Sequence, residues 1–179
     1  LLIERRPAPA DAALAREMVL GVIRRRLTLR SVMRAYLARP NVRLPNRLVD
    51  VLQVALYQML FLDRVPGFAA VNEAVEQARR IGFQRKSGMV NGLLRAVGRG
   101  LSERREGEPP LDARTVPVTP DASVRLDREV FPDPAKDPEG YLSYAGSLPD
   151  ALARRWLEAC GGDLREALSR ALHACARPP

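Results

Sequence analysis

The chain of 179 residues is 46% apolar, which is enough to bury one core with a smaller appendage and excludes a chain disordered throughout. Its formal net charge is +8, and almost all of its basic residues are arginines, since Lys86 and Lys136 are the only lysines. Planar guanidinium donors suit phosphate, so we expect RNA or an acidic protein as the partner. A GC-rich genome that encodes arginine in place of lysine is the simpler explanation of the same composition.

Neither secretion nor membrane insertion is predicted. The first ten residues are interrupted by charge and proline, unlike a signal peptide. The most apolar window, residues 48–62, is too short to span a bilayer and contains Asp50, Gln53 and Gln58. We therefore expect a cytoplasmic protein without membrane contact.

Two amphipathic helices are predicted at the start of the chain. Residues 11–27 place apolar side chains on one stripe at helical spacing, and residues 28–40 repeat the pattern until a proline stops it. Arginines surround the junction of these helices, and those at the end of the first helix suit the negative end of the helix dipole. This first cluster consists of Arg24, Arg25, Arg26 and Arg30.

Three further helices are predicted to complete a bundle. Residues 44–66 are apolar on most of the helical circumference, which is typical of a central, buried helix. Residues 71–81 and 89–97 form amphipathic helices, and Gly82 stands where a helix commonly ends in a left-handed residue. The turn between these two helices, residues 82–88, is a basic elbow.

The elbow and its flanks carry a second group of cations. The elbow sequence GFQRKSG has no second glycine before its lysine and follows a helix, whereas a phosphate-binding Walker loop needs that glycine and a preceding strand, so we interpret it as scaffolding that presents cations. Phosphate contacts from such cations give affinity without reading sequence, and a solvated face is the alternative. Because only 5% of residues are aromatic, we expect folded RNA to be recognised by shape rather than by base stacking. The predicted RNA-binding residues of this group are Arg79, Arg80, Arg85, Lys86 and Arg95.

The rest of the chain is predicted to be a linker followed by a helical pair. Residues 102–140 contain seven prolines and many charges without a helical period, so we expect short extended pieces but no sheet. Helical periodicity returns in residues 141–179. The expected fold class is therefore all-α.

No catalytic, cofactor or metal site is predicted within the chain. His173 is the only histidine, and Cys160 and Cys175 lie fifteen positions apart, which fits neither a zinc site nor a disulfide framework. One histidine near the end of the chain also suggests no serine–histidine–acid set. Acidic pairs such as Glu73 and Glu76 fall on a predicted solvated face, which is the usual place of surface charge.

Residues 55–97, ALYQMLFLDRVPGFAAVNEAVEQARRIGFQRKSGMVNGLLRAV, resemble the NusB family of all-helical RNA-binding domains. Within that family they look most like the amino-terminal domain of the ribosomal RNA small-subunit methyltransferase B group (the Sun or Fmu proteins), and residues 14–29 fit the same group. The resemblance rests on the order and spacing of the motifs YQ, LDRVP, VNEAV and VNGLLR, which begin at Tyr57, Leu62, Val71 and Val90.

This resemblance implies three parts: a NusB-like RNA-binding bundle at residues 1–101 with the family's first helix missing, a Pro-rich linker at 102–140, and a helical connector at 141–179. In such enzymes the connector leads into a catalytic domain that binds S-adenosylmethionine and forms 5-methylcytosine in 16S rRNA. We expect the chain to be the RNA-positioning part of such a methyltransferase without its catalytic domain. Its partners would be 16S rRNA and its own catalytic domain.

Two other functions stay open. A stand-alone antitermination adaptor in the regulation of transcription would bind RNA together with a ribosomal protein, although residues 141–179 argue against it. A protein-interaction bundle would use the same basic face to meet an acidic partner. Neither hypothesis predicts a catalytic residue in this chain.

Overall fold

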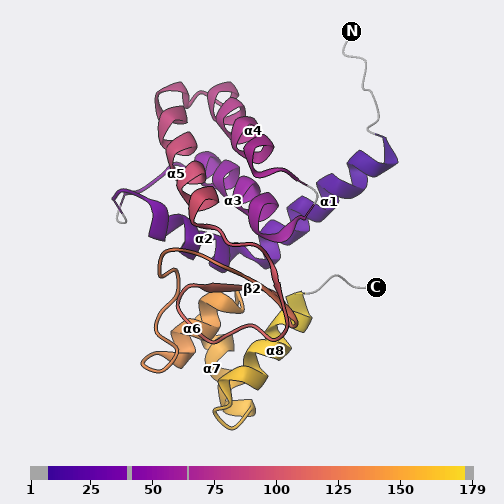
Figure 1. Ribbon diagram of the computed structural model, residues 1–179, viewed down its shortest axis with the longest axis vertical. Coiled ribbons are helices and arrows are strands. Elements are labelled where there is room, and N and C mark those ends of the chain that lie inside the picture. The colour runs from indigo at the N-terminus through magenta and orange to yellow at the C-terminus, as the bar shows by residue number, and fades with distance from the viewer. Residues whose placement is uncertain (1–7, 40–41, 64, 176–179) are drawn as a thin grey trace.

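The N-terminal part of the chain forms a helical bundle. The structure, a computed structural model, describes residues 8–39, 42–63 and 65–175. Helix α3 lies in the middle of the bundle, with the α4–α5 pair on one side and α1 and α2 on the other (Figure 1). The elements are α1 (Pro9–Arg24), α2 (Arg26–Tyr36), α3 (Asn46–Phe61), α4 (Gly67–Arg80), the short 3-10 helix η1 (Gln84–Lys86) and α5 (Ser87–Gly100).

The central position of α3 follows from its sequence. Leu48, Leu52, Leu56 and Leu60 recur every four residues and are at most 1% exposed. This leucine stripe belongs to one hydrophobic core with residues of α2, α4 and α5, among them Leu29, Val32, Val71, Ala74, Val90 and Leu94. The prediction of a central, buried helix is confirmed, and the all-α prediction is confirmed in part, since the fold is mostly helical but includes a small sheet.

Helices α4 and α5 form a hairpin that turns at the elbow. Gly82 follows α4 with a φ of 90°, a conformation that glycine adopts without steric cost. The backbone N–H of Phe83 donates to the carbonyl of Ala78 at 2.8 Å, which closes the end of α4. The predicted helix stop is therefore confirmed. The elbow points away from the rest of the molecule, at the top of Figure 1.

Residues 102–140 contain a small antiparallel sheet. Its strands have the order β1-β3-β2 and are β1 (Arg105–Glu106), β2 (Thr115–Thr119) and β3 (Ala122–Arg125). Pro117 is tolerated because β2 lies at the edge of the sheet, where a residue without an N–H is accepted. The expectation that no sheet forms is wrong, because Pro120 and Asp121 connect β2 and β3 in a tight hairpin that a search for helical periodicity does not detect.

Three helices follow the sheet, where two were predicted. They lie at the bottom of Figure 1, where α6 packs against α2 of the bundle, and are α6 (Pro138–Ala145), α7 (Asp150–Ala159) and α8 (Leu164–Cys175). The additional helix is α6, whose N-cap Asp137 accepts a hydrogen bond from the N–H of Gly140 at 2.8 Å. It is hard to predict because it has only eight residues, too few to show a clear helical period, although Asp137 and Pro138 are a usual N-cap and first residue of a helix.

Helix α2 joins the bundle to the C-terminal part. The Thr28 hydroxyl donates to the carbonyl of Tyr144 at 2.7 Å, and the Ser31 hydroxyl donates to the carbonyl of Val130. Apolar residues from the sheet region belong to the same core as the bundle, namely Val116, Val118, Val124, Leu126, Val130 and Phe131. The expectation of a linker at residues 102–140 is therefore not confirmed.

Tyr36 gives this junction a pH dependence. Burial, together with the hydrogen bond that its hydroxyl donates to Asp127, raises the pKa of Tyr36 well above its ordinary value. Because the folded-state pKa exceeds the unfolded one, this stabilisation is complete below about pH 10 and is lost as the pH rises further. We predict that the free energy of unfolding, measured in urea, falls above about pH 10 and falls less steeply for Tyr36→Phe. Some fall remains in the variant because burial also raises the pKa of Tyr141. Equal slopes for the two proteins would contradict the prediction.

Candidate nucleic-acid interface

The positive charge of the chain is concentrated in residues 18–49, which we call the basic segment. It contains eight arginines and no aspartate or glutamate. Its charge therefore equals the net charge of +8, and the remaining residues carry as many acidic as basic groups. The segment covers the end of α1, all of α2 and the start of α3. The basic segment is found by counting acidic as well as basic residues along the sequence. A search for clusters of arginine alone misses it, because it ignores the absence of acidic residues.

Three exposed arginines form a stripe along α2. Arg26, Arg30 and Arg34 follow one another at intervals of four residues, so they share one face of the helix. No ion pair or hydrogen bond joins their guanidinium groups to another residue that the structure describes, although the Gln53 side chain donates to the backbone carbonyl of Arg26 at 3.2 Å. Like charges at this spacing repel, so the helix depends on the burial of Leu29 and Val32 on its other face. Arg34 was not predicted as a site residue, although its spacing from Arg30 indicates it.

Arg25, a predicted RNA contact, lies in the core instead. It is 5% exposed, its Nη2 donates to the carbonyl of Val118 at 2.8 Å, and its guanidinium lies 5.1 Å from the centre of the Phe61 ring. Its Nη1 is buried without a partner among the described residues, and burial lowers the pKa of the guanidinium. Arg25 therefore connects the α1–α2 junction to β2 and is not available to phosphate.

Arg24 lies beside a hollow of mixed charge. The hollow has a volume of about 420 Å³ and is lined by residues of α1, α3, β2 and α8. Glu17 and Asp63 also line it. The Oδ2 of Asp63 forms an ion pair with the Nη1 of Arg104 at 2.7 Å. Acidic side chains reduce the attraction of this hollow for phosphate, so Arg24 is less suited to RNA than the α2 stripe.

The elbow cations are partly compensated. Arg79 and Arg80 both approach Glu76, at 3.9 and 3.4 Å, whereas Arg85 is exposed without an ion pair to another described residue and Lys86 is half-buried. The elbow lies at the end of the α4–α5 hairpin that is remote from the α1–α2 junction (Figure 1). The fold therefore does not bring the two predicted clusters together.

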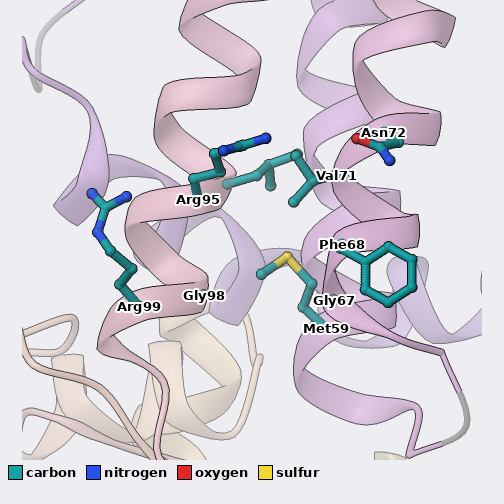
Figure 2. A pocket seen from close by; sticks show the side chains of 9 residues that line it. Met59, Gly67, Phe68, Val71, Asn72, Arg95, Gly98 and Arg99 are labelled. Atoms are coloured by element: carbon teal, nitrogen blue, oxygen red, sulfur yellow. The ribbon is translucent and has the colours of Figure 1, made fainter.

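Arg95 borders an apolar groove between α4 and α5 (Figure 2). The groove has a volume of about 500 Å³ and includes Met59, Val71 and Phe68, a residue that is 73% exposed. The Nε of Arg95 donates to the amide oxygen of Asn91 at 3.0 Å. An apolar floor offers phosphate no counterpart, so the α2 stripe is the better candidate for contact with a polyanion.

Other chemistry has little support among residues 8–39, 42–63 and 65–175. Within these ranges no group of three or more histidine, cysteine, aspartate or glutamate side chains could hold a metal ion. Cys160 and Cys175 are free thiols and half-buried. None of the helices described is long and apolar enough to cross a membrane.

The fold and its charge distribution define a mostly helical domain with a strongly basic surface on α2, where Arg26, Arg30 and Arg34 have no ion pair to another described residue. The chain belongs to the NusB family, whose sequence model matches residues 2–99. The resemblance expected from the motifs is confirmed. No solved structure matches the chain.

Relatives that match most of the chain are named as methyltransferases, whereas one that matches about half of it is named as an antitermination protein. A Bacillus subtilis protein named "probable ribosomal RNA small subunit methyltransferase B" is 28% identical over 89% of this chain and 30% of its own length. A Mycobacterium tuberculosis protein named as a methyltransferase is 31% identical over 99% of this chain and 36% of its own length. The transcription antitermination protein NusB of Heliobacterium modesticaldum is 37% identical over 54% of this chain and 47% of its own length. The chain thus spans only 30% to 36% of the two methyltransferase relatives.

Proposed function

We propose that this chain is the RNA-binding module of an S-adenosylmethionine-dependent methyltransferase that forms 5-methylcytosine in 16S rRNA. The observation that carries the proposal is the extent of the similarity. Two relatives named as methyltransferases match 89% and 99% of the chain, so the similarity continues past residue 99, where the match to the family ends. The name of the Bacillus subtilis relative supplies the substrate class, the RNA of the small ribosomal subunit.

In this proposal the module holds RNA and does no chemistry. The basic segment neutralises phosphates and positions the RNA for a catalytic domain outside these residues, where S-adenosylmethionine would bind. The stripe on α2 makes the main contacts, and the protein works in the cytoplasm, where rRNA is made. The peripheral contacts that we propose are Arg24, Arg79, Arg80, Arg85, Lys86 and Arg95.

A transcription antitermination adaptor is the second candidate. It is favoured by the similarity to the Heliobacterium protein, although that similarity covers 54% of the chain. Deleting the gene separates the two functions. Under the methyltransferase proposal, mass spectrometry of 16S rRNA from the deletion strain shows the loss of a 5-methylcytosine. Intact methylation together with reduced transcription of the rRNA operons would support the adaptor and overturn the proposal.

RNA binding by the chain should depend strongly on salt. If four to six phosphates are neutralised, the slope of the logarithm of the association constant against that of salt concentration is about −3 to −5. Fluorescence anisotropy with a labelled 16S rRNA fragment, at several potassium chloride concentrations, measures this slope. A slope near zero would show that the arginines do not meet phosphate and would overturn the RNA-binding role.

A further inference from the structure

The α2 stripe opens onto a hollow that the sequence does not reveal. It lies between α2 and the residues that lead into α3, and its volume is about 600 Å³, within the usual range of small-ligand sites. Arg30 and Arg34 line it from α2, and Arg43 lines it from the connecting segment. The chain thus places three guanidinium groups around one concave surface.

The charge around this hollow is uncompensated. All three arginines are exposed, and none is ion-paired with another residue in the described part of the chain. No acidic residue lines the hollow, and the whole basic segment lacks aspartate and glutamate. Three neighbouring cations repel one another, so an anion that accepts hydrogen bonds from several of them is the ligand that relieves this repulsion.

The floor of the hollow includes apolar side chains. Val42 is 44% exposed and Leu44 is half-buried, whereas Met33 and Leu37 are only 6% and 7% exposed. Asn46 adds an amide that can donate and accept hydrogen bonds. A free phosphate ion would use the arginines but not the floor. A nucleotide uses both, because its phosphate is anionic and the face of its base is flat and apolar.

We propose that this hollow binds one nucleotide of an unpaired RNA segment. The three guanidinium groups hold its phosphates, and its base lies on Val42 and Leu44 beside Asn46. This inference rests on the proposed RNA-binding function and gives it a defined site. It also departs from recognition by shape alone, because an unstacked base makes direct contact with the protein.

Two pairs of variants test the hollow by anisotropy with a short single-stranded RNA. Arg34→Ala with Arg43→Ala removes two of its cations, and Arg154→Ala with Arg155→Ala removes the same charge from α7. Val42→Asp places a carboxylate in the hollow at a residue that is 44% exposed, and Val19→Asp places one on α1 at a residue that is 58% exposed. We expect the hollow variants to bind at least about tenfold more weakly than their partners in each pair. Circular dichroism confirms that all four remain folded.

A second probe separates the base from the phosphate. We expect RNA in which every nucleotide is abasic to bind the wild-type chain at least about tenfold more weakly than intact RNA of equal length. Equal binding of the two RNAs would overturn the base contact, and equal binding of the paired variants would overturn the hollow. In both cases the proposed function stands if the wild-type chain binds RNA with a steep salt dependence. If the wild-type chain binds no RNA, the proposed function itself fails.

Discussion

Reversing the charge of Arg26, Arg30 and Arg34 to glutamate is expected to lower RNA affinity on the order of 100-fold at about 50 mM salt. All three side chains are exposed and have no ion pair within the described residues, so each is free to meet phosphate. The change removes up to three arginine–phosphate contacts, each of which releases a counterion from the RNA, and adds repulsion between glutamate and phosphate. The salt slope should therefore become shallower by about 2 to 3. Anisotropy titrations at several salt concentrations measure both quantities.

The elbow offers a control with the same change of charge. Replacing Arg79, Arg80 and Arg85 with glutamate also changes the net charge by six units, but two of these arginines already approach Glu76. We expect this variant to lose less than about tenfold in affinity, because compensated cations release fewer counterions. An equal loss in both variants would show that net charge alone, rather than the α2 stripe, determines binding.

Arg25→Ala is expected to lower the free energy of unfolding by about 3 kcal/mol, since it empties a buried site and leaves the carbonyl of Val118 without its donor. Arg25→Met fills most of the volume and removes a buried cation whose Nη1 has no partner among the described residues. Removing the buried cation also removes its desolvation cost, which offsets the lost hydrogen bond. We therefore expect the free energy of unfolding of Arg25→Met to stay within about 1 kcal/mol of that of the native protein. Urea unfolding followed by circular dichroism measures both.

Variants of Arg25 also test whether a buried arginine of this cluster contributes to RNA binding. Because Arg25 does not reach the surface, folded Arg25→Met should bind RNA within about twofold of the native chain and with an unchanged salt slope. Arg26→Met, next to it, removes an exposed cation and should weaken binding and flatten the slope by about 1. A loss of affinity in Arg25→Met as large as that in Arg26→Met would mean that Arg25 becomes exposed when RNA binds.

Periodicity predicted the bundle because each of its helices buries one regular face. The four-residue spacing from Leu48 to Leu60 marks the central helix, and Gly82 marks the end of α4 by its conformational freedom. Periodicity does not place Arg25, because it stands between the last residue of α1 and the first residue of α2, where the regular rotation per residue of one helix does not apply. Its burial depends on Val118, which is far away in the sequence.

The sheet and the hollow depend on tertiary contacts that local pattern does not specify. Val116 and Val118 are buried on a strand that Pro117 interrupts, and their partners in the core come from elements far away in the sequence. Arg43 meets Arg30 and Arg34 only because the residues just before α3 line the same hollow as α2. The concentration of charge in residues 18–49, in contrast, is visible in the sequence alone.

The most direct measurement is a map of the RNA contacts on the protein. The chain is bound to a 16S rRNA fragment that contains 4-thiouridine, crosslinked with ultraviolet light, digested, and analysed by mass spectrometry. RNA contact through the α2 stripe and the neighbouring hollow predicts that the crosslinked peptides come mainly from residues 26–47. Crosslinks confined to α6–α8 or to the α4–α5 groove, with none in that range, would contradict it.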